Sequence, residues 1–317
     1  MKKKVKMQAY TDWEFPSKLT LFVSALLFIL FFLVYRLFAA VYIQYFEQAK
    51  SSESILLASK KNKNILTEKH IPTPSITLTP TSSPKPTQEI IDPNAFCLNV
   101  PVIYYHHIEP VSQAAKEGHA QLTVDSQNFD EQMKYLADHG YNTISAEDLV
   151  NALLSHKPLP GKPIVVTADD GYTDIYQYAY PIIKKYNIKL SLMIPTGLLE
   201  NPDYLTWNQL KEMVDSGFVY AYDHTWSHYS LPHGGDAKDQ MEISVAKTQL
   251  EEHLGHKVKI FAYPYGTYDP RIMNLLRSDG FTGAYSTIPG TRQCDSYIFL
   301  LRRIRVGGSS LSYYGIY

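Results

Sequence analysis

The sequence has little of several features that mark large classes of protein. Its 317 residues include only two cysteines, and 30 basic residues are balanced by 31 acidic ones, which leaves a net charge of −1. A nucleic-acid-binding protein would show a basic patch or stripe, so we expect no nucleic-acid partner. No GxGxxG pattern and no P-loop occur, and the sequence therefore lacks the glycine-rich phosphate cradles of nucleotide-binding domains.

Long apolar runs are also scarce, and the longest lies near the N-terminus. Residues 19–35 are uncharged and rich in Leu, Phe and Val, and the apolar character resumes after Arg36 up to residue 43. A run of ~17 or more apolar residues fits a membrane-spanning helix. Lysines concentrated ahead of it predict a cytoplasmic N-terminus. We therefore expect a cytoplasmic basic tail (1–18) and a single-pass anchor in the cell membrane (19–43).

The alternative for this run is a cleaved signal peptide. The apolar region of such a peptide should be only ~7–15 residues long, with small residues at the cleavage site. The pair Ala39-Ala40 follows Phe38 instead of a small residue. The pattern therefore favours an uncleaved anchor.

The residues after the anchor have the composition of a spacer. Residues 72–86 are almost entirely Pro, Thr and Ser, and such a segment buries little apolar area and stays extended. We predict a disordered stalk over 44–94 that holds an extracytoplasmic globular domain, 95–317, away from the membrane.

Apolar runs and helix-like stretches alternate through this domain, as in α/β proteins with a parallel sheet. About seven such units favour a deformed (β/α) barrel of about seven parallel strands, although the pattern alone leaves a doubly wound sheet open. The expected strands are Pro101–Tyr105, Tyr141–Ser145, Ile164–Thr167, Leu190–Ile194, Phe218–Tyr222, Lys259–Tyr263 and Thr282–Ser286. The expected helices are Ser126–His139, Ala146–His156, Ile175–Tyr186, Trp207–Ser216, Ala237–Leu254 and Asp269–Gly280.

Two adjacent carboxylates, Asp169 and Asp170, end one expected strand. Side chains alternate along extended chain, so the two point different ways, and one can bind a metal while the other stays free as a base. Gly171 permits a sharp exit from the strand. A plain Asp-Gly turn is the alternative interpretation.

Two further motifs also follow strands. His224 and His228 are four residues apart, a spacing that lets both reach one ion from a single helical turn. The third motif, Tyr263 to Gly266, has the sequence Tyr-Pro-Tyr-Gly. Because chemistry in β/α barrels gathers at the carboxyl ends of the strands, the shared placement indicates one site.

In this order and spacing, the three motifs resemble the polysaccharide deacetylase family, carbohydrate esterase family four, with its NodB homology domain. The resemblance runs from about residue 100 to 306 and includes Val102–Ile108 and the residues Phe129, Gln132, Met133 and Leu136. It implies a barrel of seven strands and removal of N-acetyl groups from N-acetylglucosamine-type sugars, or of O-acetyl groups from xylan in some members. Tyr105–Ile108 and Arg302–Val306 resemble the subgroup that acts on poly-β-1,6-N-acetylglucosamine.

The resemblance also implies roles for single residues. Asp170, His224 and His228 would hold a divalent metal, most often Zn²⁺, and Asp169 would be the base. The backbone N–H of Tyr265 would stabilise the oxyanion.

The sequence departs from the family pattern at two places. Ala262 stands where an arginine often pairs with the base, and no histidine follows His256 to supply the general acid. His107 is our candidate for the acid, with His106 in a structural or supporting role.

We therefore expect metal-dependent de-N-acetylation of an envelope polysaccharide such as peptidoglycan or poly-N-acetylglucosamine. The alternatives are an O-acetyl polysaccharide esterase, a hydrolase of small amides, and an inactive glycan-binding module. Among 25 tyrosines, Tyr172, Tyr229 and Tyr265 lie near the motifs and are candidates for stacking on sugar rings.

The two cysteines fall in the predicted extracytoplasmic domain, where disulfides persist. Cys97 precedes the first expected strand and Cys294 precedes the last apolar run. In a closed barrel the first and last segments are neighbours, so we predict a disulfide between them. Two buried free thiols are the main alternative, and intermolecular pairing through Cys97, beside the stalk, is a further one.

Overall fold

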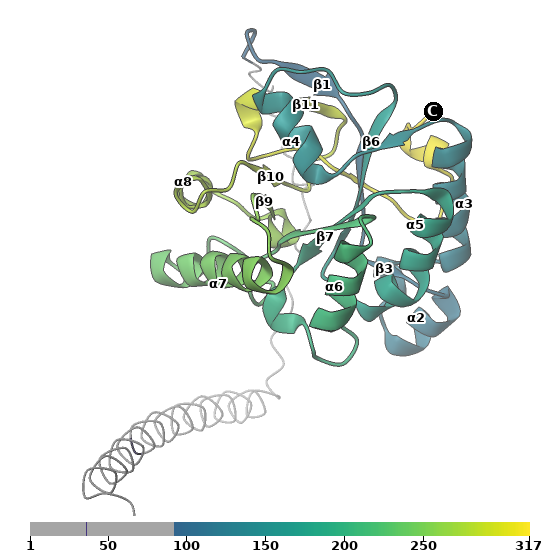
Figure 1. Cartoon of the computed structure of the whole chain (residues 1–317), viewed down its shortest axis with the longest axis horizontal. Helices are drawn as coiled ribbons and strands as arrows, with labels where there is room; N and C mark the ends of the chain where they lie inside the picture. Colours follow the sequence, from purple (N-terminus) through teal and green to yellow (C-terminus); the bar gives the residue numbers. More distant parts are fainter. Residues whose placement is uncertain (1–35, 37–91) are drawn as a thin grey trace, which may run out of the picture. The chain divides into compact units, whose positions relative to one another are not determined.

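Parallel strands form the centre of the part of the chain that this computed structural model describes, Arg36 and residues 92–317 (Figure 1). Within these residues the sheet order is β10-β9-β8-β7-β6-β2-β12, and every neighbouring pair is parallel. An eighth short strand, β5, pairs with β6 beside this order. The strands are β2 (Val102–Tyr105), β5 (Asn142–Thr143), β6 (Pro163–Asp169), β7 (Leu190–Ile194), β8 (Val219–Asp223), β9 (Ile260–Ala262), β10 (Gly283–Tyr285) and β12 (Ile304–Arg305).

The strand order shows that the sheet curls on itself. From β2 to β10 the strands follow one another in sequence order without reversal, so the crevice of a doubly wound sheet, where the order reverses, has no counterpart here. Leu301 forms a parallel bridge with Tyr285 at the β10 edge, and a few residues later β12 pairs with β2. The segment from Leu301 to β12 thus contacts both edges of the sheet, at β10 and at β2. This arrangement is consistent with the predicted deformed barrel.

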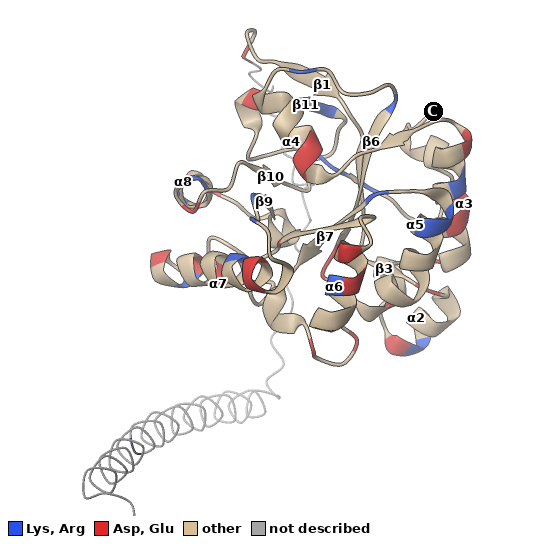
Figure 2. Ribbon diagram, viewed as in Figure 1, with Lys and Arg blue, Asp and Glu red and all other residues tan. Residues whose placement is uncertain are grey.

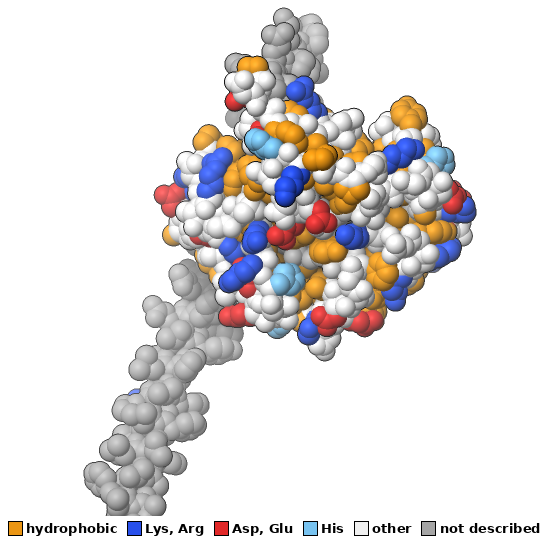
Figure 3. Space-filling view, turned by 45° about the horizontal axis from the view of Figure 1, so that its top comes forward, with side chains coloured by type: hydrophobic (Ala, Val, Ile, Leu, Met, Phe, Trp, Pro, Cys, Tyr) orange, Lys and Arg blue, Asp and Glu red, His pale blue; other side chains and the backbone are white. Residues whose placement is uncertain are grey.

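Helices lie around the sheet (Figure 1). Two of them begin with capping boxes, in which Ser145 pairs with Asp148 and Thr206 with Gln209; such caps satisfy N–H groups that have no partner inside the helix. Both acidic and basic residues lie on α6 and α7 (Figure 2) and across the face seen in Figure 3. The helices are α2 (Val111–Glu117), α3 (Ser126–Asp138), α4 (Ala146–Leu154), α5 (Tyr180–Tyr186), α6 (Trp207–Asp215), α7 (Asp236–Leu254) and α8 (Pro270–Ser278), and a π-helical turn, η2 (Ile175–Ala179), precedes α5.

Alternating side chains on the strands fill two separate layers of the core. On β6, Ile164 and Val166 pack into the larger cluster with the helices, whereas Val165 packs into the smaller one with Met193 and Tyr285. This alternation with period two places Asp169 on the same face of β6 as Val165.

The predicted disulfide between Cys97 and Cys294 is confirmed. It joins β1 (Cys97–Asn99) to β11 (Arg292–Cys294), an antiparallel pair in which the two cysteines are direct partners with Cα atoms 4.1 Å apart. The bridge closes a loop of 197 residues, and for so long a loop the chain-entropy model gives a stabilisation of up to ~5 kcal/mol.

The predicted elements of the domain are found with shifts of a few residues at their ends. Helix α2 was not predicted, because its seven residues, VSQAAKE, carry no apolar periodicity. The predicted tail, the anchor apart from Arg36, and most of the stalk lie outside the described residues. At Arg36 and within 92–317, the structure contains no helix with the length and apolarity needed to cross a membrane.

Candidate active site

The two adjacent aspartates lie where β6 ends. Asp169 is its last residue, and Asp170 turns the chain with a φ of 74°, followed by Gly171 at 69°. A non-glycine residue at positive φ is strained, and such strain gathers at functional sites. At Gly171 an added Cβ would lie 3.0 Å from the Ile194 side chain, so both the turn and the packing favour glycine.

Asp169 is held by an arginine that the sequence motifs did not identify. Arg303 Nη1 donates to Asp169 Oδ1 (2.7 Å) and Nη2 donates to Oδ2 (2.9 Å), and both side chains are buried. Arg303 Nε also donates to the carbonyl oxygen of Ser286 (2.9 Å), which fixes the guanidinium plane. Burial by itself raises the pKa of Asp169, but the charge and hydrogen bonds of Arg303 outweigh it and lower the pKa below its ordinary value.

Arg303 thus pairs with Asp169. In the family that the motifs resemble, this pairing often comes from an arginine at the position that Ala262 holds here. In the sequence it stands in the run Arg302-Arg303-Ile304-Arg305, where nothing distinguishes it from its neighbours. The missing arginine at position 262 was the only signal that another cation must pair with Asp169.

Asp170 and the two histidines of the second motif converge. Asp170 Oδ1 lies 3.5 Å from His224 Nε2 and 3.1 Å from His228 Nε2. Their ligand atoms all lie within 4.8 Å of one another. We had expected the two histidines to share a helical turn, but they do not. Residues 224–230 form a loop in which Thr225 and His228 have positive φ (66° and 57°).

A hydrogen bond to the backbone fixes the tautomer of His224, whose Nε2 atom faces Asp170. Its Nδ1 contacts the carbonyl oxygen of Ala262 at 2.8 Å, and a carbonyl only accepts, so Nδ1 carries the proton and neutral His224 presents a lone pair at Nε2. Asp170 Oδ1 is buried and has no hydrogen-bond donor with suitable geometry. A carboxylate and an imidazole lone pair directed at one point fit a divalent cation.

Burial raises the pKa of Asp170, but hydrogen bonds and charge from His224 and His228, which act while their Nε2 atoms carry protons, outweigh burial and hold it well below its ordinary value. A cation in place of those protons would lower the pKa in the same direction. Asp170 is therefore an ionised carboxylate, which is the form that binds metal.

His107, our candidate for the acid, does not line the cleft. Its ring is buried, with Nδ1 donating to Asp174 Oδ2 (2.5 Å), and it stacks behind Tyr172 with ring centroids 3.6 Å apart. His106, to which we had assigned a structural or supporting role, lines the cleft together with Asp169 and Asp170. Burial lowers the pKa of His106 below its ordinary value, although both aspartates oppose the shift.

These side chains meet in a cavity of about 520 Å³. Tyr172 and Tyr265 line it, and Tyr265 is 68% exposed, with its ring 4.6 Å from that of His228. Tyr229 does not line it and packs against the core instead. The cavity is lined by Tyr104, His106, Leu122, Asp169, Asp170, Tyr172, Leu198, Tyr204, His224, Ser227, His228, Tyr263, Tyr265, Thr287, Arg303 and Arg305.

Comparison with known proteins identifies the class to which this fold and site belong. The family model of polysaccharide deacetylases matches residues 156–284. The Bacillus subtilis protein YxkH, whose name classes it among polysaccharide deacetylases, is 31% identical over 219 residues, covering 69% of this chain and 75% of YxkH. The chain belongs to the polysaccharide deacetylase family and is a hydrolase of that class.

More specific likenesses point in the same direction. The poly-β-1,6-N-acetyl-D-glucosamine N-deacetylase of Escherichia coli K12 is 24% identical over 56% of this chain, which spans only 32% of that enzyme. Among solved structures, the Streptococcus pyogenes deacetylase PplD in complex with acetate matches with a TM-score of 0.64, 29% identity, and coverage of 68% of this chain and 96% of PplD. IcaB of Ammonifex degensii matches with a TM-score of 0.59 and 28% identity, over 66% of this chain and 91% of IcaB.

Proposed function

We propose that this protein removes N-acetyl groups from an N-acetylglucosamine-containing polysaccharide of the cell envelope, with a divalent metal ion, Zn²⁺, held by Asp170, His224 and His228. The observation that carries the proposal is the convergence of these three side chains beside the buried Asp169–Arg303 pair. One carboxylate and two imidazoles leave positions open on the ion, as a catalytic zinc site requires.

A divalent ion bound there supplies Lewis-acid chemistry, because it lowers the pKa of a water molecule toward ~7 and polarises a carbonyl oxygen. Asp169 is the base that takes the proton of the attacking water. Its lowered pKa keeps it unprotonated and able to accept. Arg303 orients this carboxylate, and the backbone N–H of Tyr265 donates to the carbonyl oxygen as negative charge develops there.

His106 is the general acid in this proposal, in place of His107. It lines the same cavity as Asp169 and Asp170, and the pKa lowered by burial makes its protonated form a stronger proton donor. His106 gives its proton to the amide nitrogen, so that the amine leaves as the acetyl carbon–nitrogen bond breaks. Acetate and a free amino sugar are the products.

The polymer is proposed from the relatives. The E. coli enzyme is named for poly-β-1,6-N-acetyl-D-glucosamine, and the exposed ring of Tyr265 beside the metal ligands offers a face on which a sugar can stack. Peptidoglycan carries the same acetamido group and is the other substrate to compare. An uncleaved anchor over residues 19–43 would keep the enzyme beside such polymers, with the domain outside the cytoplasm.

The test is acetate release by the full-length chain from poly-N-acetylglucosamine, peptidoglycan, chitin oligomers and acetylated xylan. We expect release from an N-acetylated polymer, its loss on chelation, and its recovery on adding Zn²⁺. His228→Ala should abolish the recovery because the third ligand is missing. Release from acetylxylan alone would assign an O-acetyl esterase, and binding of polymer without turnover by the zinc-loaded chain would assign a binding module.

The anchor is tested separately by fractionation and N-terminal sequencing. We expect the mature protein to retain residues 1–45 and to sediment with membranes. A mature N-terminus near residue 41 would instead show a cleaved signal peptide.

A further inference from the structure

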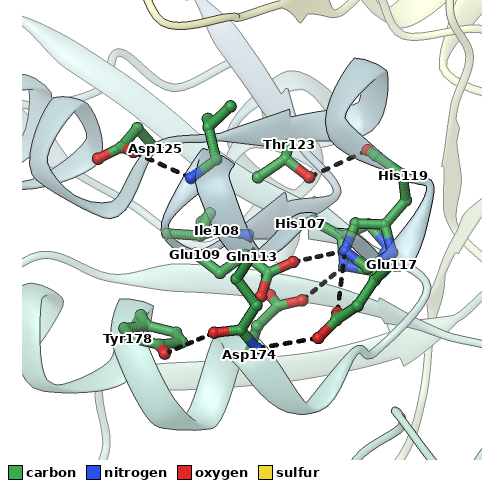
Figure 4. A network of polar contacts seen from close by, with 11 residues as sticks. His107, Ile108, Glu109, Gln113, Glu117, His119, Thr123, Asp125, Asp174 and Tyr178 are labelled. Atoms are coloured by element: carbon green, nitrogen blue, oxygen red, sulfur yellow. Dashed lines mark hydrogen bonds and ion pairs between the residues drawn. The ribbon is translucent and has the colours of Figure 1, made fainter. Parts of the chain in front are cut away.

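Figure 4 shows a second group of histidines and carboxylates. It contains none of the residues that line the cavity, and its His107 stacks on Tyr172. We call it the His119 cluster, and it consists of His107, Glu109, Glu117, His119 and Asp174. His107 lies in β3 (His107–Ile108), and Glu109 follows this strand. Glu117 ends helix α2, His119 lies in the loop after it, and Asp174 directly precedes η2. The proposed reaction uses none of them.

His107 is held in one tautomer by Asp174. The Oδ2 atom of Asp174 accepts from His107 Nδ1 (2.5 Å), while Oδ1 accepts the backbone N–H of Ile108 (3.0 Å). With the proton on Nδ1, neutral His107 presents a lone pair at Nε2. A histidine whose other nitrogen donates to a carboxylate is the usual arrangement of a metal ligand.

The cluster carries more negative than positive charge in a place with little water. Glu109 and Asp174 are buried, with side chains 3% and 8% exposed, and Glu117 is half exposed. The three carboxylates of the cluster outnumber its two imidazoles, so the rings alone cannot match the three carboxylates with one positive charge each. Burying a carboxylate is costly unless a cation compensates it, so the cluster favours a bound positive ion.

The donor atoms lie close enough for one ion. The ligand atoms of His107, Glu109 and His119 all lie within 4.8 Å of one another. His119 Nε2 contacts Glu109 Oε1 and lies 3.5 Å from Glu117 Oε2. Two imidazoles and two carboxylates form a ligand set that suits zinc.

The ring of His119 must turn for this set to close on an ion. Its plane is parallel to that of His107 within 2°, with centroids 3.9 Å apart, so the in-plane lone pairs of the two rings do not meet. His119 lies in the loop between α2 and η1 (Ala120–Leu122) and its side chain is 23% exposed, which leaves it room to rotate.

We propose that the His119 cluster is a second binding site for a zinc-type divalent cation, with His107, Glu109 and His119 as ligands, Glu117 completing the set, and Asp174 orienting His107. The ion shapes one wall of the active-site cavity. Tyr172, which stacks on His107, and Leu122, three residues after His119, both line that cavity. This proposal does not depend on the reaction proposed above.

The test is the zinc content of the full-length chain without a polyhistidine tag, measured by mass spectrometry after dialysis and by titration against a zinc indicator. We expect two equivalents for the unmutated chain. His228→Ala and His119→Ala should each retain one, and the double variant none. His139→Ala, which removes an exposed histidine elsewhere, is the matched control and should retain two.

Two further variants separate ligation from folding. Glu109→Gln keeps the shape and hydrogen bonding of the side chain but removes its charge, and should weaken binding in the His228→Ala background. Asp174→Asn should weaken it by ~10- to 100-fold, as for other residues that orient metal ligands. Circular dichroism of each variant checks that the fold persists.

Three results would overturn the proposal. One is a single equivalent in the unmutated chain that His119→Ala leaves in place, another is no zinc in His228→Ala, and the third is one equivalent retained in the double variant. The first two would mean that protons alone compensate these carboxylates. Loss of zinc in His119→Ala with unchanged content in His228→Ala would contradict the function proposed for Asp170, His224 and His228 and leave the second site standing.

Discussion

Arg303 donates two parallel hydrogen bonds to Asp169, from Nη1 to Oδ1 at 2.7 Å and from Nη2 to Oδ2 at 2.9 Å. The two residues are separated by 134 positions in the chain. A guanidinium matches a carboxylate at both oxygens, so the pair fixes the orientation of Asp169 as well as its charge. A lysine would supply charge at one point and leave the carboxylate free to rotate.

Arg303→Lys should therefore lower kcat by about 100-fold, the size of effect expected when a reacting group is misplaced by ~1 Å. It should also move the acid limb of the pH–rate profile to higher pH. Arg303 opposes the effect of burial on the pKa of Asp169; with a weaker partner that pKa rises, and the base is protonated over more of the low-pH range. The measurement is kcat/KM against pH, with Arg277→Lys on the surface as control. An unchanged acid limb would contradict the assignment.

Asp169→Asn should keep the metal and lose activity by ~10²–10⁴-fold, because asparagine cannot take a proton from water. Asp169 is not among the three residues whose ligand atoms converge, Asp170, His224 and His228. The zinc content of the variant should therefore match that of the unmutated chain. Turnover near normal in the zinc-loaded variant would remove Asp169 from the role of base.

His106→Ala and His107→Ala should have different effects on the alkaline limb of the pH–rate profile. The first removes the proposed acid, so we expect kcat to fall by ~10²–10⁴-fold and the alkaline limb of the pH–rate profile to disappear. The second removes a ring packed behind Tyr172 and should keep the alkaline limb. If instead His107→Ala loses that limb and His106→Ala keeps it, His107 is the acid after all.

Replacing both Cys97 and Cys294 by serine should lower the free energy of unfolding by ~2–5 kcal/mol, as for other native disulfides. Denaturant unfolding of the two proteins without reductant measures the difference. The unmutated chain, denatured but not reduced, should show no reactive thiols. Two reactive thiols would contradict the bridge.

The parts of the site that the sequence predicted are those carried by local patterns. Asp169 and Asp170 follow an apolar strand, and four-residue spacing brings His224 and His228 together whether the backbone is a helical turn or, as here, a loop with positive φ. The cysteine pair could be predicted because a barrel would make its two segments neighbours and no third cysteine competes; in the structure the two segments pair as β1 and β11.

The choice between His106 and His107 could not be made in this way. Residues of a strand alternate between its two faces, and a shift of one position exchanges them. The segment Val102–Tyr105 is apolar or aromatic at every position and buried on both faces, so no alternation shows which face is inner. Arg303 was missed for a different reason. Its partner is distant in sequence, and the two meet because the chain after β10 returns to pair with β2 as β12.

The segment that contains Arg303 has a consequence for the order in which the enzyme matures. Asp169, Asp170, His224 and His228 all precede residue 290, whereas Arg303 lies in the segment that runs from the β10 edge to β12. A nascent chain of 290 residues would therefore contain every proposed metal ligand and the base, but not the residue that orients the base. Loss of this short segment by proteolysis would have the same effect. If Asp169 is the base, the site is therefore complete only after the segment that joins the two ends of the sheet has been synthesised.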